Sequence, residues 1–332
     1  MAEKTYDVVG IGNAIVDIIA RCDDGFLSKR SLDKGMMRLI SSEEAADLYE
    51  DMGPATERSG GSVANSIAGL ASLGAKCGFI GRVAADQFGG IFRHDIRSLG
   101  IEYGTEPALD GAPTARCLVL VTPDGERTMN TYLGASVDLG PSDIDAALVD
   151  AAKYVYLEGY LFDKDEAKSA FRAAAKRAKD AGAKVVLSLS DPFCVDRHRD
   201  DFRALVKDGA DIVFANEQEI TSLYETNTFL EAADAALQDC EMAVLTRSEA
   251  GSLIVGGGEA IEVAAEHVDQ VVDATGAGDL YAAGFLFGLS RGAALADCGR
   301  LGSMAAAEAI SHIGARPERD LAELAASRGL LP

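Results

Sequence analysis

Residues 153–190, "KYVYLEGYLFDKDEAKSAFRAAAKRAKDAGAKVVLSLS", hold two short apolar segments separated by a helical pattern. The segments at 153–161 and 183–190 are typical of buried β-strands, and residues 165–182 have the amphipathic spacing of a helix. A strand, a helix and a second strand in this order form a βαβ unit, whose strands run parallel. This stretch therefore predicts an α/β fold.

The alternation continues on both sides of this unit. Further strands are expected at 6–22 with a break at Gly12 and Asn13, and at 76–83, 210–216 and 242–248; further helices are expected at 61–74, 86–100, 217–224, 278–292 and 295–315. Residues 112–135 predict a β-hairpin with "PDGE" as its turn. These patterns indicate a single domain over 1–332, in which a mostly parallel sheet has helices on both faces. The hairpin at 112–135 and part of 14–40 are expected to project from it.

The composition narrows the function classes. The 332 residues are 48% apolar, and 31 basic against 53 acidic residues give a net charge of -22. This charge opposes binding to nucleic acid or to an anionic membrane, but backbone amides can still bind a small anion. No segment is long and apolar enough to span a membrane. The six cysteines are scattered without metal-ligand spacing, as expected for buried thiols of a cytoplasmic protein.

The segment "DATGAGD" at 273–279 precedes an apolar helical run. If the helix begins near Asp279, the amides of residues 274–278 point into one concavity, where the helix dipole attracts an anion. Gly276 and Gly278 let the backbone approach that anion closely. Asp279 is then placed to accept a proton from an attacking hydroxyl. The alternative is a glycine-rich turn with Asp279 as the N-cap.

Two further segments are candidates for binding a polyol. "GGSVAN" at 60–65 opens a helix, and "GNAIVD" at 12–17 places Asn13 and Asp17 four residues apart. A carboxylate accepts two hydrogen bonds from a vicinal diol, and an amide both donates and accepts, which suits a sugar ring. The alternatives are a tight turn with a packing asparagine, and a polar break in an edge strand.

"NEQE" at 216–219 follows a predicted strand. Asn216 as N-cap and Glu219 three residues later form a capping box. Glu219 is also a candidate for contact with a hydrated Mg²⁺, because this ion keeps several waters in proteins. The usual nucleotide motifs do not occur: "GIGNAI" at 10–15 lacks the third glycine of G-x-G-x-x-G, and no P-loop is present.

Taken together, "SGGSVANSIAGLASLGAKCGFIGRVAADQFG" at 59–89, "NEQE" and "DATGAGD" resemble the ribokinase-like (PfkB) family of carbohydrate and nucleoside kinases, over nearly the whole chain. Ala274 replaces the first Thr of the family's D-T-T-G-A-G-D. The resemblance implies a three-layer α/β/α sandwich with a mostly parallel central sheet and a small β-sheet lid, to which roughly 14–40 and 112–135 contribute. It also implies ATP-dependent phosphorylation of a primary hydroxyl.

The resemblance assigns roles by position. Asp279 is the base, and Gly276, Ala277 and Gly278 form the anion hole. The acceptor is held by Asn13, Asp17, Gly61, Ser62 and Asn65. The nucleotide site is expected to include Asn216, Thr246, Gly251, Thr275, Gly276 and Gly278, with Glu219 near Mg²⁺ through water. A monovalent cation such as K⁺ is compatible with the motif that carries Asp273 and Thr275.

Within the family, "GNAIVDI" at 12–18 followed by "DDGFLSKRSLDKGMM" at 23–37, and "LSLSDPFCV" at 187–195, resemble the adenosine kinase branch, although Ala14 replaces a Pro. This branch implies adenosine as acceptor, with Phe162, Phe193 and Met37 as candidates for the purine pocket. The alternatives are a kinase for ribose, fructose or a ketodeoxy sugar acid, and a nucleoside-binding relative without activity. The expected partners are the small-molecule acceptor and ATP, and the chain is expected to be a monomer or a homodimer.

Overall fold

The structure is a computed structural model that describes residues 4–331. Its main sheet has eight strands in the order β13-β12-β11-β10-β9-β8-β1-β5. The six strands from β11 to β5 are parallel, and β12 and β13 are added antiparallel at one edge. The strands are β1 (Tyr6–Ile11), β5 (Cys77–Ile80), β8 (Ala152–Glu158), β9 (Lys184–Ser188), β10 (Ile212–Asn216), β11 (Met242–Thr246), β12 (Ser252–Gly256) and β13 (Glu259–Val263).

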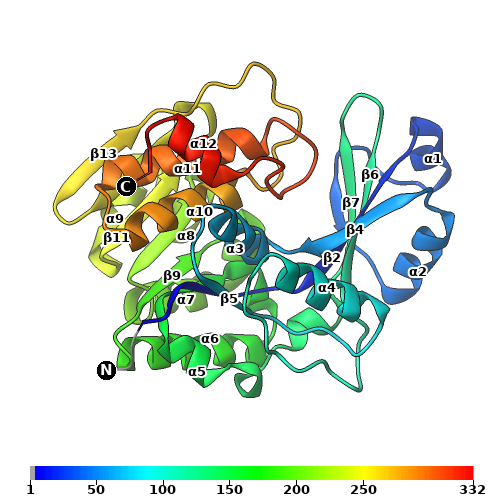
Figure 1. Cartoon of the computed structure of the whole chain (residues 1–332), viewed down its shortest axis with the longest axis horizontal. Coiled ribbons are helices and arrows are strands. Elements are labelled where there is room, and N and C mark those ends of the chain that lie inside the picture. Colours follow the sequence, from blue (N-terminus) through cyan, green and yellow to red (C-terminus); the bar gives the residue numbers. More distant parts are fainter. Residues whose placement is uncertain (1–3, 332) are drawn as a thin grey trace.

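Helices cover both faces of this sheet because successive residues of each strand point to opposite sides. In β1, for example, Val8 packs into one hydrophobic core and Val9 into the other. One face carries α3 (Ser62–Ser72), α4 (Gln87–Ser98), α10 (Ala277–Ser290), α11 (Leu295–Ala309) and α12 (Leu321–Ser327). The other carries α5 (Ala146–Asp150), α6 (Asp165–Asp180), α7 (Pro192–Asp208), α8 (Glu217–Tyr224) and α9 (Phe229–Asp239). The predicted three-layer fold is confirmed (Figure 1).

A second sheet stands beside the layered body (Figure 1). Its order is β3-β7-β6-β2-β4. The strands are β2 (Ile15–Arg21), β3 (Met37–Leu39), β4 (Ala55–Gly60), β6 (Ala115–Val121) and β7 (Arg127–Tyr132). The hairpin β6–β7 turns at "TPDGE" as predicted, with Gly125 in the left-handed region. The sequence assigned only residues 14–40 and 112–135 to this sheet, so β4 was not predicted as part of it.

The two faces of the second sheet differ. Leu118 and Leu120 pack on the outer face against α1 (Asp24–Lys29) and α2 (Ser42–Asp51). On the inner face, the apolar side chains of β6 pack with Ile15, Ile19, Met129 and Ile313. β2 has a partner strand on each side, so the interpretation of "GNAIVD" as part of an edge strand was wrong.

Two smaller features of the described residues bear on the site. The helix predicted to extend to residue 315 ends at Ala309, and the segment that follows is irregular. This segment returns to the body because the Ile310 carbonyl accepts the Val272 amide and the buried Glu308 carboxylate accepts the amides of Glu318 and Arg319. Within residues 4–331, no helix combines the length and apolarity that crossing a membrane requires.

Candidate active site

Asp279 lies in the first turn of α10. The helix begins at Ala277, and its N-cap is Gly276, which has a left-handed backbone with φ 79°. An added Cβ at Gly276 would also lie 2.6 Å from the Ala315 Cβ, so both the backbone conformation and a steric clash disfavour a side chain here. Asp279 is therefore the third residue of the helix, and the alternative that it is the N-cap was wrong. The carboxylate is still close to the positive end of the helix dipole.

The Asp279 carboxylate is held by two side chains of α3. Ser62 Oγ donates to Oδ1 at 2.7 Å, and Asn65 Nδ2 donates to Oδ2 at 3.0 Å. Residues three apart lie on one face of a helix, which is why both reach the same group. The helices α3 and α10 pack closely because Gly69 leaves room for Leu280 and Ala283. The sequence predicted these residues separately, and the structure brings them together.

The backbone amides in front of α10 are only partly available to a ligand. The first hydrogen bond of the helix runs from the Leu280 amide to the Gly276 carbonyl, so the amides of Gly276, Gly278 and Asp279 precede the regular pattern. The Thr275 amide donates to Asp273 Oδ1, and the Ala277 amide donates to the Ala274 carbonyl. Two of the amides expected to form an anion hole at residues 274–278 are thus already bonded within the protein, and the anion hole itself stays a prediction.

Burial raises the pKa of Asp279 to about 6, although the hydrogen bonds from Ser62 and Asn65 and the charge of Arg316 oppose this shift. The nearby Asp17 carboxylate raises the pKa further. A carboxylate with a pKa near neutrality is suited to proton transfer, because it takes up a proton readily and still ionises at physiological pH.

Asp17 lies on β2 and faces the same region. Its carboxylate oxygens are so close to Gly60 that an added Cβ there would be 2.3 Å from Oδ2. Among residues 4–331, no protein donor forms a hydrogen bond with this carboxylate. Burial raises its pKa, while the charges of Arg316, Arg127 and Arg58 lower it. Asp17 therefore offers two acceptor oxygens to a ligand between the two sheets.

Asn13 has different surroundings from those expected. Its Nδ2 donates to Glu158 Oε1 at 2.7 Å, and its Oδ1 accepts a hydrogen bond from Ser136 Oγ at 2.8 Å. The side chain is buried, and its role in holding an acceptor stays a prediction. Gly61 is needed for close approach, since an added Cβ would lie 2.1 Å from the Asn13 carbonyl oxygen.

The predicted nucleotide residues lie at the carboxyl ends of neighbouring parallel strands. Asn216 ends β10 and Thr246 ends β11, and the two are register partners. Gly251 follows in a turn that only a residue without a side chain fits, because an added Cβ would lie 2.1 Å from the Val263 carbonyl oxygen. The carboxyl edge of a parallel sheet is the usual location for ligands in open α/β folds.

Asn216 and Glu219 form the predicted capping box. Glu219 Oε1 also accepts a hydrogen bond from Asn216 Nδ2 at 2.7 Å. Burial raises the Glu219 pKa to about 7, and the charges of Asp191 and Asp279 add to this shift. Within residues 4–331, no group of three His, Cys, Asp or Glu side chains is arranged to hold a metal ion. A nearby cation would relieve the repulsion between these carboxylates, so the residues fit a hydrated Mg²⁺.

Of the purine-pocket candidates, Phe162 was wrong: it is buried and stacks on Phe202 with 4.1 Å between ring centroids. Phe193 is exposed at the start of α7. Met37 is also exposed, and it pairs with Met129 across β3 and β7, so both lie on the inner face of the second sheet.

Several charged residues of the site were not predicted. Glu158, at the end of β8, is buried with a pKa raised to about 7, mainly by desolvation. Its Oε2 accepts the Val63 amide of α3, which satisfies one of the helix's first amides. An acid at the end of a buried strand, in "YLEGY", is the signal that could have identified it. The basic residues Arg127 and Arg316 follow no motif.

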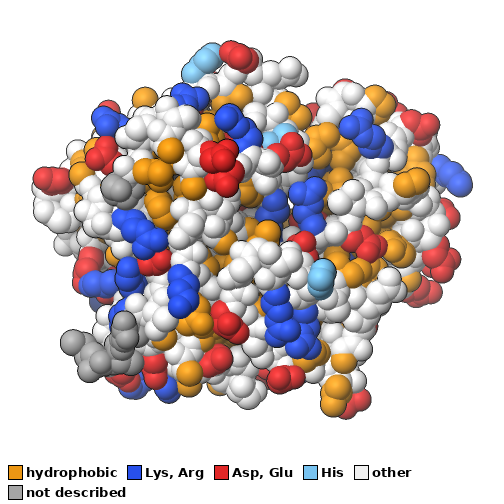
Figure 2. All heavy atoms as spheres, viewed as in Figure 1, with side chains coloured by type: hydrophobic (Ala, Val, Ile, Leu, Met, Phe, Trp, Pro, Cys, Tyr) orange, Lys and Arg blue, Asp and Glu red, His pale blue; other side chains and the backbone are white. Residues whose placement is uncertain are grey.

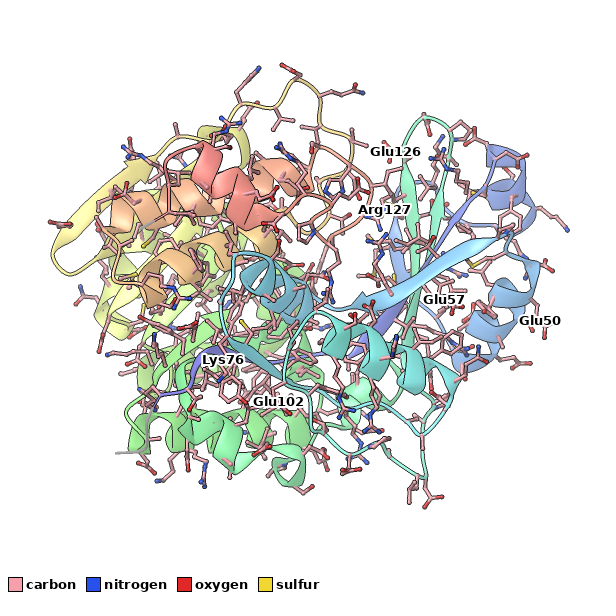
Figure 3. The ribbon with its side chains drawn as sticks, viewed as in Figure 1. Glu50, Glu57, Lys76, Glu102, Glu126 and Arg127 are labelled. Atoms are coloured by element: carbon pink, nitrogen blue, oxygen red, sulfur yellow. The ribbon has the colours of Figure 1, made fainter. Side chains whose placement is uncertain are left out.

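Arg127 begins β7 and lies near the hairpin turn (Figure 3). Its Nη1 donates to Asp273 Oδ2, and this carboxylate also accepts the Gly314 amide at 2.9 Å. Desolvation would raise the Asp273 pKa, but these donors and the Arg127 charge hold it below the usual value. Lys and Arg side chains are visible between the second sheet and the body (Figure 2).

The chain matches known kinases over most of its length. Residues 31–320 match the model described as pfkB family carbohydrate kinase. A solved structure titled adenosine kinase from Sinorhizobium meliloti is 52% identical, has a TM-score of 0.89 and covers 97% of this chain and 99% of that chain. A probable sugar kinase protein from Rhizobium etli CFN 42 is 50% identical, with a TM-score of 0.91, covering 99% of this chain and 100% of that chain.

A curated relative from Halopiger xanaduensis, named ATP-dependent ribose-1-phosphate kinase, is 32% identical over 68% of this chain and 72% of its own length. The fold, the site and these matches define a phosphotransferase that acts on an alcohol group. The chain belongs to the pfkB family of carbohydrate kinases, as its motifs predicted.

Proposed function

We propose that the protein is an adenosine kinase, which transfers the γ-phosphoryl group of ATP to the 5′-hydroxyl of adenosine. The observation that carries this proposal is the Asp279 carboxylate, which lies beside the free amides of α10 and is oriented by Ser62 and Asn65. A hydroxyl within reach of Asp279 would lose its proton to the carboxylate as it attacks phosphorus. The amides of Gly276 and Gly278 would stabilise charge on the phosphoryl oxygens.

The acceptor side supports a nucleoside. Asp17 provides unpaired carboxylate oxygens for the ribose diol, and Gly60 leaves room for this carboxylate. The inner face of the second sheet exposes Met37 and Leu39, an apolar surface suited to a purine base. The 52% identity to the S. meliloti adenosine kinase adds to this support.

The donor side supports ATP with Mg²⁺. Asn216, Thr246, Gly251 and Thr275 line the carboxyl ends of β10 and β11 and the start of α10 in this proposal. Glu219 would contact the ion through water, and the bound ion would neutralise charge on the phosphates. A monovalent cation near Asp273 and Thr275 stays a prediction.

A specific observation favours a second candidate, a kinase for an anionic sugar such as a sugar phosphate or a ketodeoxy sugar acid. Arg58, Arg127 and Arg316 all lie close enough to Asp17 to lower its pKa. Guanidinium groups are well suited to bind phosphate and carboxylate. The Halopiger relative carries a name with such a substrate.

An ATP-coupled assay with three acceptor panels tests the proposal. The panels contain purine nucleosides, neutral sugars, and sugar phosphates or sugar acids, each at equal concentration. Adenosine should give a kcat/KM at least about tenfold above any other acceptor, because base and diol contacts both contribute to binding. A preference for an anionic sugar would replace the proposal with the second candidate. Calorimetric binding of adenosine without turnover would indicate a non-catalytic relative.

A further inference from the structure

Arg316 lies in the irregular segment after α11, and its side chain is only 7% exposed. Its Nε donates to Asn65 Oδ1 at 2.9 Å, and its Nη2 donates to Ser59 Oγ at 2.9 Å. Ser59 in turn donates through Oγ to Asp95 Oδ2 at 2.6 Å. The guanidinium is therefore fixed at two points, one on α3 and one on β4. The remaining nitrogen, Nη1, is buried without a protein partner in residues 4–331.

This arrangement decides which way the Asn65 amide points. A guanidinium has five donors and no acceptor, so it can form a hydrogen bond only with the oxygen end of the amide. With Oδ1 facing Arg316, the Nδ2 group faces Asp279 and donates to Oδ2. If the amide were reversed, Asn65 Oδ1 would face Asp279 Oδ2. The two oxygens would repel each other unless Asp279 carried a proton.

The second contact of Asp279 acts in the same direction. Ser62 Oγ donates to Oδ1, so both carboxylate oxygens accept a hydrogen bond from α3. Donors at both oxygens stabilise the ionised carboxylate, which is the form that can accept a proton. Burial opposes ionisation of Asp279, and the hydrogen bonds from Ser62 and Asn65 act against this effect.

We propose that Arg316 is a positioning residue: it fixes the Asn65 amide so that Asp279 is held as an acceptor carboxylate directed at the hydroxyl of the substrate. This inference rests on the proposed function, in which Asp279 is the base. Arg316 acts through Asn65 and contributes to the rate of the chemical step rather than to binding of the acceptor.

Other charged groups face the same pair and set the background for any pH measurement. Asp279 is influenced by Asp17 on β2, Glu158, Tyr156 and Tyr160 at and after β8, and Glu219 on α8. Arg316 is influenced by Asp95 on α4, Asp17 on β2, Arg58 on β4 and Asp279 on α10. The Arg316 variants described below keep all of these groups except Arg316 itself.

The test is the pH profile of kcat for Arg316→Met, which keeps an unbranched side chain and removes every donor. At about pH 6, kcat should fall by about fivefold or more, and the acidic limb should move up by about one pH unit, so that activity partly recovers at alkaline pH. The KM for the acceptor should change little. A raised acceptor KM with unchanged kcat, or an unshifted profile, would overturn the proposal.

Arg97→Gln is the matched control. Arg97 also makes two hydrogen bonds, both to the Tyr103 carbonyl, and it contacts neither Asn65 nor Asp279. Its loss should leave the kcat profile unchanged. If Arg316→Met does not fold in a thermal melt, Arg316→Lys replaces it. One ammonium cannot bridge Asn65 and Ser59 as the planar fork does, so a smaller shift in the same direction is expected; an unshifted profile here also contradicts the proposal.

A double-mutant cycle shows whether Arg316 acts through Asn65. Once Asn65→Ala has removed the amide, adding Arg316→Met should lower kcat little further at a pH above the acidic limb, where the direct effect of the Arg316 charge on the Asp279 pKa no longer limits the rate. Additive losses there would mean that Arg316 acts by another route. Asp279→Asn separates the two levels. If Asp279→Asn keeps full turnover, the proposed function fails at its base; if it loses turnover while the Arg316 variants behave as wild type, only this inference fails.

Discussion

The two sides of the candidate site carry opposite charges. The side formed by the layered body has the carboxylates Glu158, Glu219 and Asp279, and the pKa of each is raised, chiefly by burial. The side next to the second sheet has Arg58, Arg127 and Arg316. On the basic side, Arg127 and Arg316 are bonded to groups of the body, Asp273 and Asn65. The acidic side thus holds carboxylates with raised pKa values, and Arg316 on the basic side bonds to Asn65, which donates to one of them, Asp279.

This difference explains how an acidic protein can act on anions. The net charge of -22 is a property of the whole surface, whereas a phosphate group meets only the charges within a Debye length. Those charges include the buried arginines, and backbone amides at a helix start can bind an anion locally. Composition argued against polyanions as partners and left the site itself undetermined.

The largest expected effect is the loss of the proton acceptor on the acidic side. Asp279→Asn keeps the size of the side chain and should lower kcat by about 10²-fold or more, with the acceptor KM little changed. Steady-state kinetics and a thermal melt test this together. Wild-type turnover in a folded variant would contradict the assignment of Asp279 as base.

A matched pair of glycine variants tests the amides in front of α10. Gly276→Ala forces a side chain into a left-handed backbone and against Ala315, so kcat should fall about tenfold or more and the melting temperature should drop. At Gly278 an added Cβ meets no protein atom within 4 Å. Gly278→Ala should therefore melt like wild type, and any rise in its KM for ATP reports the approach of the nucleotide. Equal melting temperatures for both variants would contradict the structural role of Gly276.

Asp17→Ala addresses the acceptor at the border of the two sides. The acceptor KM should rise by about tenfold, because the hydrogen bonds to the diol are lost, while the KM for ATP stays within about twofold. The wild type should use 2′- or 3′-deoxyadenosine less well than adenosine, and this difference should disappear in the Asp17→Ala variant. An unchanged acceptor KM would remove Asp17 from the proposed site.

The smallest effect concerns stability and pH. The pKa values of Glu158 and Glu219 in the folded protein are about 7, above their ordinary value of 4.5. Between about pH 4 and pH 7 the folded protein therefore binds more protons than the unfolded chain, and the free energy of unfolding falls as pH rises. Carboxylates with lowered pKa values, such as Asp7, Asp86 and Asp273, change their contribution below this window.

Denaturant titrations of the ligand-free protein across this pH range measure how the free energy of unfolding changes with pH. Glu158→Gln removes one of the two groups and should flatten the dependence by on the order of 1–3 kcal/mol between the limits. A stability that rises from about pH 5 to about pH 7 would contradict the raised pKa values.

Much of the fold followed from local pattern. The alternation of apolar strands and amphipathic helices predicted the parallel sheet, since period-2 and period-3.6 patterns are local properties of the chain. "DATGAGD" and "GGSVAN" pointed to Asp279, Ser62 and Asn65 through their resemblance to the family's motifs, because glycine at a helix start also fits an ordinary turn. The end of α11 was misjudged, because an Ala-rich run continues the helical pattern beyond Ala309, where bonds from Val272 and Glu318 hold the backbone in another path.

Other parts of the site required contacts between distant residues. Asn13 was expected to face a ligand, and its amide instead contacts Glu158, which lies 145 residues further along the chain. Arg316 bonds to Asn65 across 251 residues, and Phe162 was a candidate ligand contact until its stacking on Phe202 became visible. A side chain's polarity says that it needs a partner when buried, but it does not say which one.

The sequence by itself determined the alternation of strands and helices in the main sheet, the family and the motifs that carry Asp279, Ser62 and Asn65. Only the tertiary structure decided that α3 and α10 lie close enough for two donors to hold that carboxylate, and that arginines from the second sheet and the C-terminal segment surround the nearby Asp17. The physical reason is the range of the interactions. Backbone preference and hydrophobic period act over a few residues, whereas ion pairs, hydrogen bonds and desolvation depend on neighbours that only folding brings together.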